Sequence, residues 1–347
     1  MPSVPPIRRF YASLRKARER PDLPESRLAL VHEPTQKALQ KITGARSALE
    51  NAGGAAATGA TGIVAPAVRA LRRIEARLQR PLRIAVIGEF NSGKSTLANL
   101  LVRIESLPTA VIPNTRIPTL LYHSRAPEIF AVSPDRSRRR LRAAAPAPPQ
   151  PIFRLEVGLP VARLKAVEIL DMPGLADARL DGSIADLPQH SVDIALWCTL
   201  CTQAWKESER AAWHDVAPRM RRRGFLVATH RDLLQSADVD KLLERLHDDA
   251  GPWFRGVLPL STLEALTVTR AGHDAGAGTV WQASGAAALE TALDDLIHSV
   301  RTERLAAALD VTARVAGRAL SRIAPAAAAA ARAVPAVTAR RASPTIS

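Results

Sequence analysis

The sequence predicts an α/β fold with a mostly parallel central sheet that is covered by helices on both faces. Short apolar runs alternate with helix-length amphipathic segments between residues 81 and 265, an order typical of parallel strands joined by helices. The runs at residues 192–198 and 225–228 are apolar on both faces apart from Asp193, as buried parallel strands are. The run at residues 82–87 leads through a glycine-rich segment into another helix.

Two helices are expected before the sheet, over residues 34–51 and 63–80. The second has an apolar residue every three to four positions, with Pro66 in its first turn and Pro81 at its end. The expected strands cover residues 82–87, 120–123, 129–132, 152–157, 166–170, 192–198, 225–228 and 257–260. Later helices are expected over residues 207–223, 239–248 and 286–309.

These elements divide the chain into a nucleotide domain and flanking segments. We expect a basic, disordered arm over residues 1–24, helices within residues 25–80, the central domain over residues 81–265, and a helical segment over residues 266–322. Residues 323–347 contain mainly Ala, Pro and Arg, which offer too few large side chains for a packed core, so we expect a disordered tail. An arginine-rich stretch at residues 133–151 is expected to be an exposed insertion.

Composition limits the class of protein. The chain has 347 residues and a formal net charge of +15, which favours an anionic partner such as a nucleotide, a nucleic acid or an acidic membrane surface. With only 2 cysteines it has no disulfide framework. No apolar run reaches the roughly 18 residues of a membrane-spanning helix, and the N-terminus lacks the apolar core of a signal peptide. We expect a cytoplasmic protein, with a peripheral membrane location as the alternative.

The glycine-rich segment has the spacing G-x-x-x-x-G-K-S of the phosphate-binding loop in nucleoside-triphosphatases. It reads Gly88-Glu89-Phe90-Asn91-Ser92-Gly93-Lys94-Ser95-Thr96. Gly88 and Gly93 permit backbone angles that turn successive N–H groups toward phosphates, and the following helix N-terminus adds further N–H groups. Lys94 is expected to contact the β- and γ-phosphates, and the Ser95 hydroxyl to hold Mg²⁺. The whole stretch is therefore predicted to bind nucleotide.

Two downstream motifs predict the γ-phosphate and metal side of this site. The sequence Asp171-Met172-Pro173-Gly174 closes the strand at residues 166–170, so that the Asp171 carboxylate can hold a water bound to Mg²⁺ and the Gly174 N–H can bind the γ-phosphate. A threonine between the loop helix and the next strand can complete the metal coordination. Thr115 is the predicted ligand, with Thr119 as the alternative.

Two further motifs predict the base-binding side. Thr229-His230-Arg231-Asp232 follows the strand at residues 225–228, where the Asp232 carboxylate can accept the two N–H groups that guanine presents and adenine does not. Ser261 ends the last strand, where its backbone N–H is expected to meet the guanine carbonyl. Because all these motifs follow strands, they should meet at the carboxyl edge of one sheet.

The phosphate loop, the DMPG sequence at residues 171–174 and two other stretches together resemble the bacterial branch of the dynamin superfamily. These stretches are Leu107-Pro108-Thr109…Pro113-Asn114-Thr115…Pro118-Thr119 and Cys201-Thr202-Gln203-Ala204-Trp205-Lys206-Glu207-Ser208-Glu209. The similarity covers roughly residues 63–310. It implies a GTPase domain whose preceding and following helices form a small bundle, GTP as substrate with Mg²⁺, activation by nucleotide-dependent dimerisation, and action at membranes in many members.

Three positions depart from the pattern of GTPases. Phe90 and Leu175 stand where a glutamine commonly orients the attacking water, and His230 replaces the usual lysine along the nucleotide. Two alternatives to a dynamin-like GTPase therefore stay open. One is an Era/TrmE-type GTPase that acts on RNA or the ribosome, although no recognisable RNA-binding pattern occurs in residues 263–347. The other is a guanine-nucleotide-dependent interaction module that does not hydrolyse GTP.

Overall fold

The computed structural model describes residues 32–55, 61–104, 117–141, 151–174, 187, 190–216, 218–271 and 277–333. The chain forms two compact units, which are described separately. One contains Pro81–Val300, and the other combines Ser26–Arg80 with Arg301–Ser347. The predicted arm at residues 1–24, together with Thr115 and Leu175, lies outside the described residues.

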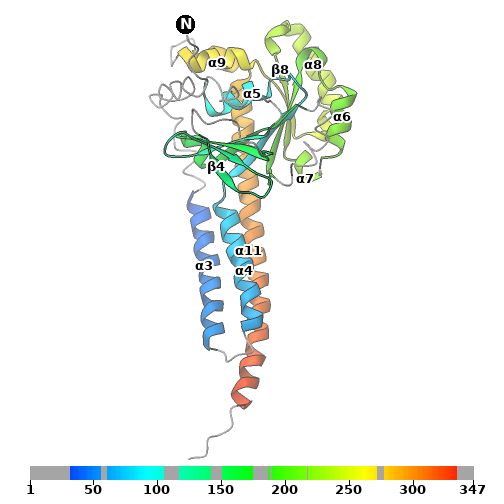
Figure 1. Ribbon diagram of the computed structural model, residues 1–347. Coiled ribbons are helices and arrows are strands. Elements are labelled where there is room, and N and C mark those ends of the chain that lie inside the picture. Colours follow the sequence, from blue (N-terminus) through cyan, green and yellow to red (C-terminus); the bar gives the residue numbers. More distant parts are fainter. Residues whose placement is uncertain are drawn as a thin grey trace, which may run out of the picture. The chain divides into compact units, whose positions relative to one another are not determined.

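The first unit is built on a 9-stranded sheet with the order β4-β3-β5-β2-β6-β1-β7-β8-β9 (Figure 1). Its strands are β1 (Leu82–Gly88), β2 (Thr119–His123), β3 (Glu128–Val132), β4 (Arg138–Arg140), β5 (Arg154–Leu159), β6 (Val167–Asp171), β7 (Ile194–Leu200), β8 (Gly224–Thr229) and β9 (Gly256–Pro259). Strands β6, β1, β7, β8 and β9 are parallel to one another. The β2–β6, β3–β5 and β3–β4 pairs are antiparallel, so the mostly parallel sheet predicted from sequence has an antiparallel flank.

Helices cover both faces of this sheet, as the sequence predicts (Figure 1). The helices of this unit are α5 (Lys94–Val102), α6 (Glu207–His214), α7 (Pro218–Arg221), α8 (Ser236–Asp249), α9 (Thr262–Ala271), α10 (Ala277–Ala283) and the first part of α11 (Ala286–Ala333). On one face, Leu97 of α5 and Leu293 of α11 share a core with Ile84 of β1. On the other face, Trp213 of α6 and Leu246 of α8 share a core with Trp197 of β7.

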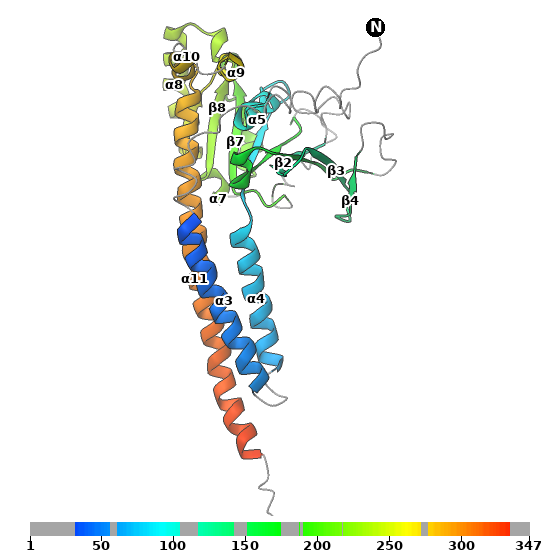
Figure 2. The same ribbon diagram turned by 90° about the vertical axis from the view of Figure 1, so that its left-hand side faces the viewer.

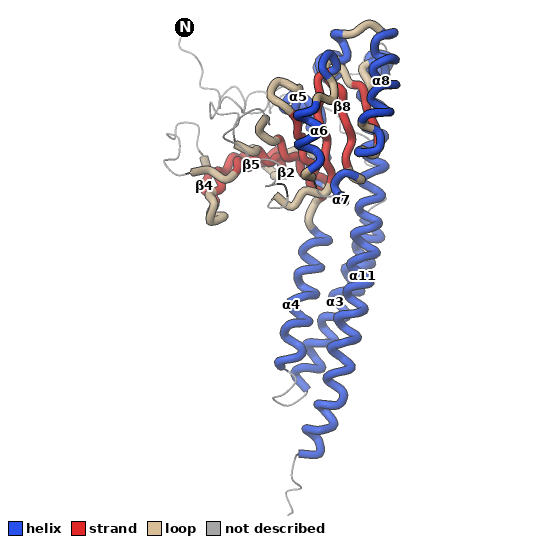
Figure 3. Tube along the Cα trace, turned by 90° about the vertical axis from the view of Figure 1, so that its right-hand side faces the viewer, coloured by secondary structure: helices blue, strands red, loops and turns tan. Residues whose placement is uncertain are grey.

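Three predictions about the elements and their limits need correction. The expected helix over residues 207–223 is two helices, α6 and α7, because Pro218 has no N–H for a continuous helix and begins the second one instead. The expected insertion at residues 133–151 contributes β4 to the sheet edge (Figure 3). The central unit continues to Val300 rather than residue 265, since α11 buries Leu289, Leu293 and Leu296 in the sheet core.

The second unit is a helical bundle of α3 (His32–Ala55), α4 (Thr61–Gln79) and residues 301–333 of α11, which lie side by side in Figure 2. Leu49 of α3, Leu71 of α4 and Ile323 of α11 belong to its core. The Arg46 guanidinium also lies 3.1 Å from the Glu75 carboxylate between α3 and α4. The predicted tail at residues 323–347 is helical through Ala333, because alanine is the strongest helix former and extends α11 without large side chains.

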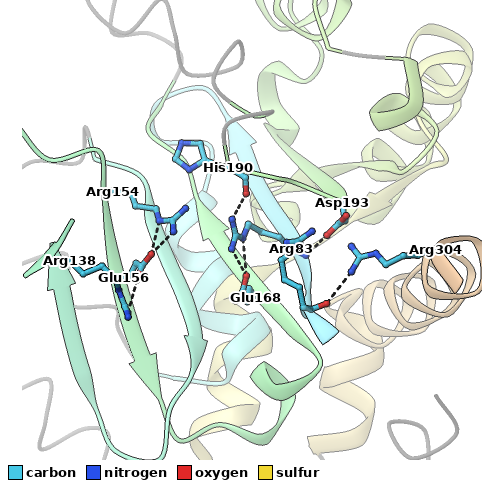
Figure 4. Close-up of polar contacts among 9 residues, drawn as sticks. Arg83, Arg138, Arg154, Glu156, Glu168, His190, Asp193 and Arg304 are labelled. Atoms are coloured by element: carbon cyan, nitrogen blue, oxygen red, sulfur yellow. Dashed lines mark hydrogen bonds and ion pairs between the residues drawn. The ribbon is translucent and has the colours of Figure 1, made fainter. Parts of the chain in front are cut away.

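A buried arginine joins β1, β6 and the segment that precedes β7 at the end of the sheet opposite the phosphate loop. Arg83 of β1 donates from Nε to Glu168 of β6 at 2.9 Å and from its guanidinium to the backbone carbonyl of His190, while its backbone N–H donates to Asp193 at 2.9 Å (Figure 4). A buried charge is tolerated only when such partners replace water. The cluster fixes the chain just before β7, so that β7 runs parallel to β1 toward the loop.

Candidate nucleotide-binding site

The phosphate loop joins the carboxyl end of β1 to the N-terminus of α5. Gly88 has φ of 147°, and a Cβ placed there would lie 2.2 Å from the Cys198 carbonyl oxygen of β7. Gly93 has φ of 80° and immediately precedes α5. Both conformations suit glycine. The close approach of Gly88 to β7 therefore fixes the start of the loop, and Gly93 turns its end into the helix.

Lys94 points back into this loop. Its side chain is buried, and Nζ donates a hydrogen bond to the backbone carbonyl of Glu89. Burial lowers the pKa of Lys94, although Asp171 and Glu89 oppose the change by favouring the ammonium form. A buried ammonium that is held by a loop carbonyl carries positive charge where phosphate oxygens would lie in a loop of this type.

Ser95 and Asp171 meet beside Lys94. The Ser95 Oγ donates to Asp171 Oδ2 at 2.7 Å, and burial raises the pKa of Asp171 to about 6 against the opposing effects of Ser95 and Lys94. The other carboxylate oxygen, Oδ1, is buried and has no hydrogen-bond partner among the described residues. A hydroxyl and a carboxylate with a spare buried oxygen fit Mg²⁺, which prefers oxygen ligands and retains several waters.

Gly174, the residue predicted to bind the γ-phosphate, lies directly against the loop. A Cβ on Gly174 would come within 2.9 Å of Phe90 Cα and 3.0 Å of Phe90 N. Phe90 itself is 60% exposed. Of the two candidate threonine ligands, Thr119 is described: it pairs with Asp171 across the antiparallel β2–β6 ladder. Thus Thr119 is near the predicted metal position, whereas the structure provides no test of Thr115.

The end of β8 closes the other side of the loop. The Thr229 hydroxyl donates to the Ser92 carbonyl at 2.9 Å and is fully buried. His230 adopts a left-handed backbone with φ of 57°, and its Cε1 lies 3.3 Å from the position of a Cβ on Gly93. The predicted base-reading motif is therefore attached to the phosphate loop through Thr229 and His230.

Asp232 and Ser261 also come together. The Ser261 Oγ donates to Asp232 Oδ1 at 2.7 Å, joining the ends of β8 and β9. The expected contact of the Ser261 backbone N–H with guanine is not supported, because that N–H donates to the Ser284 carbonyl at 2.8 Å. Ser261 instead contacts the predicted guanine-reading carboxylate through its side chain. Asp232 remains exposed.

Sequence reasoning assigned no role to Lys206 and Ser208, which contact the phosphate loop from the start of α6. The Glu89 carboxylate accepts from Lys206 Nζ at 2.9 Å and from Ser208 Oγ at 2.6 Å. In the same first turn of α6, Glu209 is buried and accepts hydrogen bonds from Trp197 and Thr199 of β7. The available signal was a Glu at the third position of an expected helix, where its carboxylate can accept a free backbone N–H, as Glu209 does here from the Lys206 N–H at 3.0 Å.

The sheet order and the loop have the arrangement of a P-loop GTPase fold. Comparison with known sequences gives a match to the dynamin family over residues 84–145. Dynamin-like protein 2 of Campylobacter jejuni is 25% identical over 211 residues, covering 56% of this chain and 33% of that protein. The isoniazid-induced protein IniC of Mycobacterium tuberculosis is 36% identical over 126 residues, covering 33% of this chain and 25% of that protein.

A solved structure, described as an oligomerised bacterial dynamin pair, matches this chain with a TM-score of 0.58 at 16% sequence identity. The match covers 84% of this chain and 47% of the chain in that structure. The similarity therefore confirms the resemblance to the bacterial dynamin-like GTPases. This chain spans between a quarter and a third of the length of these curated relatives. Among the helices that the structure describes, none is long and apolar enough to cross a membrane.

Proposed function

We propose that the protein binds GTP with Mg²⁺ and hydrolyses it to GDP and phosphate. The observation that carries this proposal is the 2.7 Å hydrogen bond between Ser95 and Asp171 beside buried Lys94, with a spare carboxylate oxygen at the same place. These groups lie where β1 and β6 end, which is the edge at which parallel α/β sheets bind ligands. The GTPase resemblance supports the choice of nucleotide.

In the proposed reaction, the protein supplies positioning and charge. The loop N–H groups and Lys94 bind the phosphate oxygens and stabilise the negative charge that develops on them. Ser95, Thr115 and, through water, Asp171 would hold Mg²⁺, which would supply positive charge to the phosphate oxygens. Gly174 donates its N–H to the γ-phosphate. The contact of Gly174 with Phe90 supports this role because it brings the backbone after β6 to the loop.

Guanine preference is proposed to reside in Asp232. Its carboxylate is exposed at the end of β8, held by Ser261, and linked through Thr229 and His230 to the loop. Two N–H groups on guanine match the two oxygens of a carboxylate, whereas adenine has no such pair. Because Ser261 uses only one lone pair of Oδ1, the carboxylate keeps acceptor capacity for a base.

Nucleotide-dependent dimerisation is proposed to activate hydrolysis. Phe90 occupies the position of a water-orienting glutamine and is 60% exposed, so a second copy could supply the group that this loop lacks. Phosphate release should be measured at protein concentrations that span a hundredfold range. A specific rate that rises with concentration supports dimer-activated hydrolysis. A concentration-independent rate contradicts the dimer, and no turnover at any concentration supports an interaction module that binds nucleotide without hydrolysis.

We also propose an anionic membrane surface as a partner. All three residues of β4, Arg138, Arg139 and Arg140, are exposed at the sheet edge, and the solved bacterial dynamin pair is described as sensing and tethering membranes. Basic side chains each favour binding to anionic lipid. Flotation with vesicles rich in phosphatidylglycerol, compared with phosphatidylcholine vesicles and with ribosomes, tests this choice. Retention on ribosomes alone would favour the Era/TrmE-type alternative.

A further inference from the structure

Glu89 links the inside of the phosphate loop to the start of α6. On the inner side, its backbone carbonyl accepts hydrogen bonds from Lys94 Nζ and from Ser92 Oγ at 2.8 Å. On the outer side, its carboxylate accepts from Lys206 Nζ at 2.9 Å and from Ser208 Oγ at 2.6 Å. The carbonyl and the carboxylate of one residue are therefore held by separate sets of donors.

The outer donors are themselves fixed to the sheet. The Lys206 backbone N–H donates to Glu209 Oε2 at 3.0 Å, and the same carboxylate accepts from Thr199 Oγ1 at 2.8 Å and Trp197 Nε1 at 3.1 Å. Glu209 is only 2% exposed. Lys206 and Ser208 are exposed, but both belong to a helix start that Glu209 bonds to β7, so the backbone that carries the two donors is held in place.

The negative charge of Glu89 explains why these contacts matter for phosphate binding. A carboxylate in a loop that cradles polyphosphate repels the ligand if it turns inward, and the repulsion is stronger where water is excluded. Partial burial of Glu89 opposes ionisation, but the hydrogen bonds from Ser208 and Lys206 outweigh it and lower the pKa of the carboxyl. Glu89 is therefore charged near neutral pH, and its charge must be directed away from the phosphates and balanced.

We propose that Lys206 and Ser208 are positioning residues for nucleotide binding, which hold the Glu89 carboxylate outside the phosphate cradle and balance its charge. This inference rests on the proposed binding of GTP. These contacts also fix the peptide between Glu89 and Phe90, against which Gly174 packs. Residues that follow β7 thereby control the geometry of a loop that lies more than a hundred positions earlier in the chain.

The test is calorimetry: the affinity of each protein variant for a non-hydrolysable GTP analogue is measured in the presence of Mg²⁺. Lys206→Met and Ser208→Ala should each weaken binding, with Lys206→Met the larger effect at about 5- to 50-fold. Lys206→Arg should retain most of the affinity. Adding Glu89→Gln to Lys206→Met should restore affinity to within about threefold of the native chain, since no charge then remains to be balanced.

Glu207→Gln is the matched control, because Glu207 lies in the same helical turn, is 83% exposed and pairs only weakly with Arg210 at 3.7 Å. It should bind as the native chain does. Equal affinities of the native chain, Lys206→Met and Ser208→Ala would overturn the inference while GTP binding stands. Failure of Glu89→Gln to rescue would show that the loss of affinity in Lys206→Met does not come from the unbalanced charge of Glu89, and would also overturn the inference. Absence of binding by the native chain would instead contradict the proposed function.

Discussion

The Ser95 hydroxyl donates a 2.7 Å hydrogen bond to the buried Asp171 carboxylate, although the two residues are 76 positions apart. The contact arises because β1 and β6 are parallel neighbours, with Val86 opposite Asp171 in the ladder. The loop that follows β1 and the carboxylate that ends β6 therefore meet at one sheet edge. This relationship supports the proposed metal site.

Ser95→Ala should remove the hydroxyl ligand of Mg²⁺ and lower GTP hydrolysis by at least about a hundredfold, because positioning and charge neutralisation supply most of the catalysis in phosphoryl transfer. Phosphate release as a function of Mg²⁺ concentration measures the effect. Ser236→Ala, at an exposed helix start, is the control and should hydrolyse GTP at the native rate. A native magnesium dependence in Ser95→Ala would contradict the assignment of this ligand.

Gly174→Ala should disturb the phosphate loop, because its Cβ would meet backbone atoms of Phe90 at 2.9 and 3.0 Å. We expect GTP binding to weaken about tenfold, or about 1.4 kcal/mol, with the fold retained. Gly251→Ala is the matched control, since a Cβ there meets nothing within 4 Å. Equal GTP affinities for the two variants would exclude close packing of Gly174 on the loop.

Glu209→Ala should destabilise the first unit. It leaves the buried Trp197 Nε1 without an acceptor and removes the acceptor of the Lys206 N–H, for a loss of about 3 kcal/mol in the free energy of unfolding. Urea unfolding followed by tryptophan fluorescence measures this. Glu244→Ala, on the exposed face of α8, should change the free energy of unfolding by less than about 0.5 kcal/mol. An equally small loss in the free energy of unfolding for Glu209→Ala would show that the hydrogen bonds of Glu209 contribute little to stability.

His190 should make the fold sensitive to acid. Burial, with further contributions from Arg154, Arg83 and Arg136, lowers the pKa of His190 from 6.5 to about 4. The unfolded chain therefore takes up a proton more readily, so the contribution of neutral His190 is complete above pH 6.5 and is lost as pH falls toward 4, by about 3 kcal/mol.

His190→Leu should accordingly flatten the loss of stability between pH 6.5 and 4. Denaturant unfolding at a series of pH values measures it, with His247→Leu on the exposed face of α8 as the control. His190 stacks on Phe153 at 4.6 Å between ring centroids, and an apolar replacement keeps that contact. An unchanged pH slope in His190→Leu would assign the acid sensitivity to other groups.

The sequence predicted the parts of the site that local motifs encode. Gly88, Lys94 and Asp171 follow from glycine spacing and from strand ends, because parallel strands bring their carboxyl ends to one edge. The antiparallel pairing of β2 with β6 was not predictable, because periodicity indicates a strand but not its direction relative to its neighbours. Nor was β4, whose three arginines lack the apolar alternation that marks a strand.

Long-range polar contacts were the other failure. Lys206 and Glu89 lie 117 positions apart, and the sequence around either residue does not indicate that the two form an ion pair. The engagement of the Ser261 N–H by Ser284 likewise depends on how α10 ends against β9. Such contacts follow from tertiary packing, so only the structure reveals them.

The most direct test of the account is the affinity of the native chain, Lys94→Ala and Asp232→Ala for GTP and ATP with Mg²⁺, measured by calorimetry. The account predicts that the native chain prefers GTP, that Asp232→Ala abolishes this preference, and that Lys94→Ala eliminates binding of both nucleotides. Equal affinity of the native chain for GTP and ATP, or an unchanged GTP preference in Asp232→Ala, would contradict it.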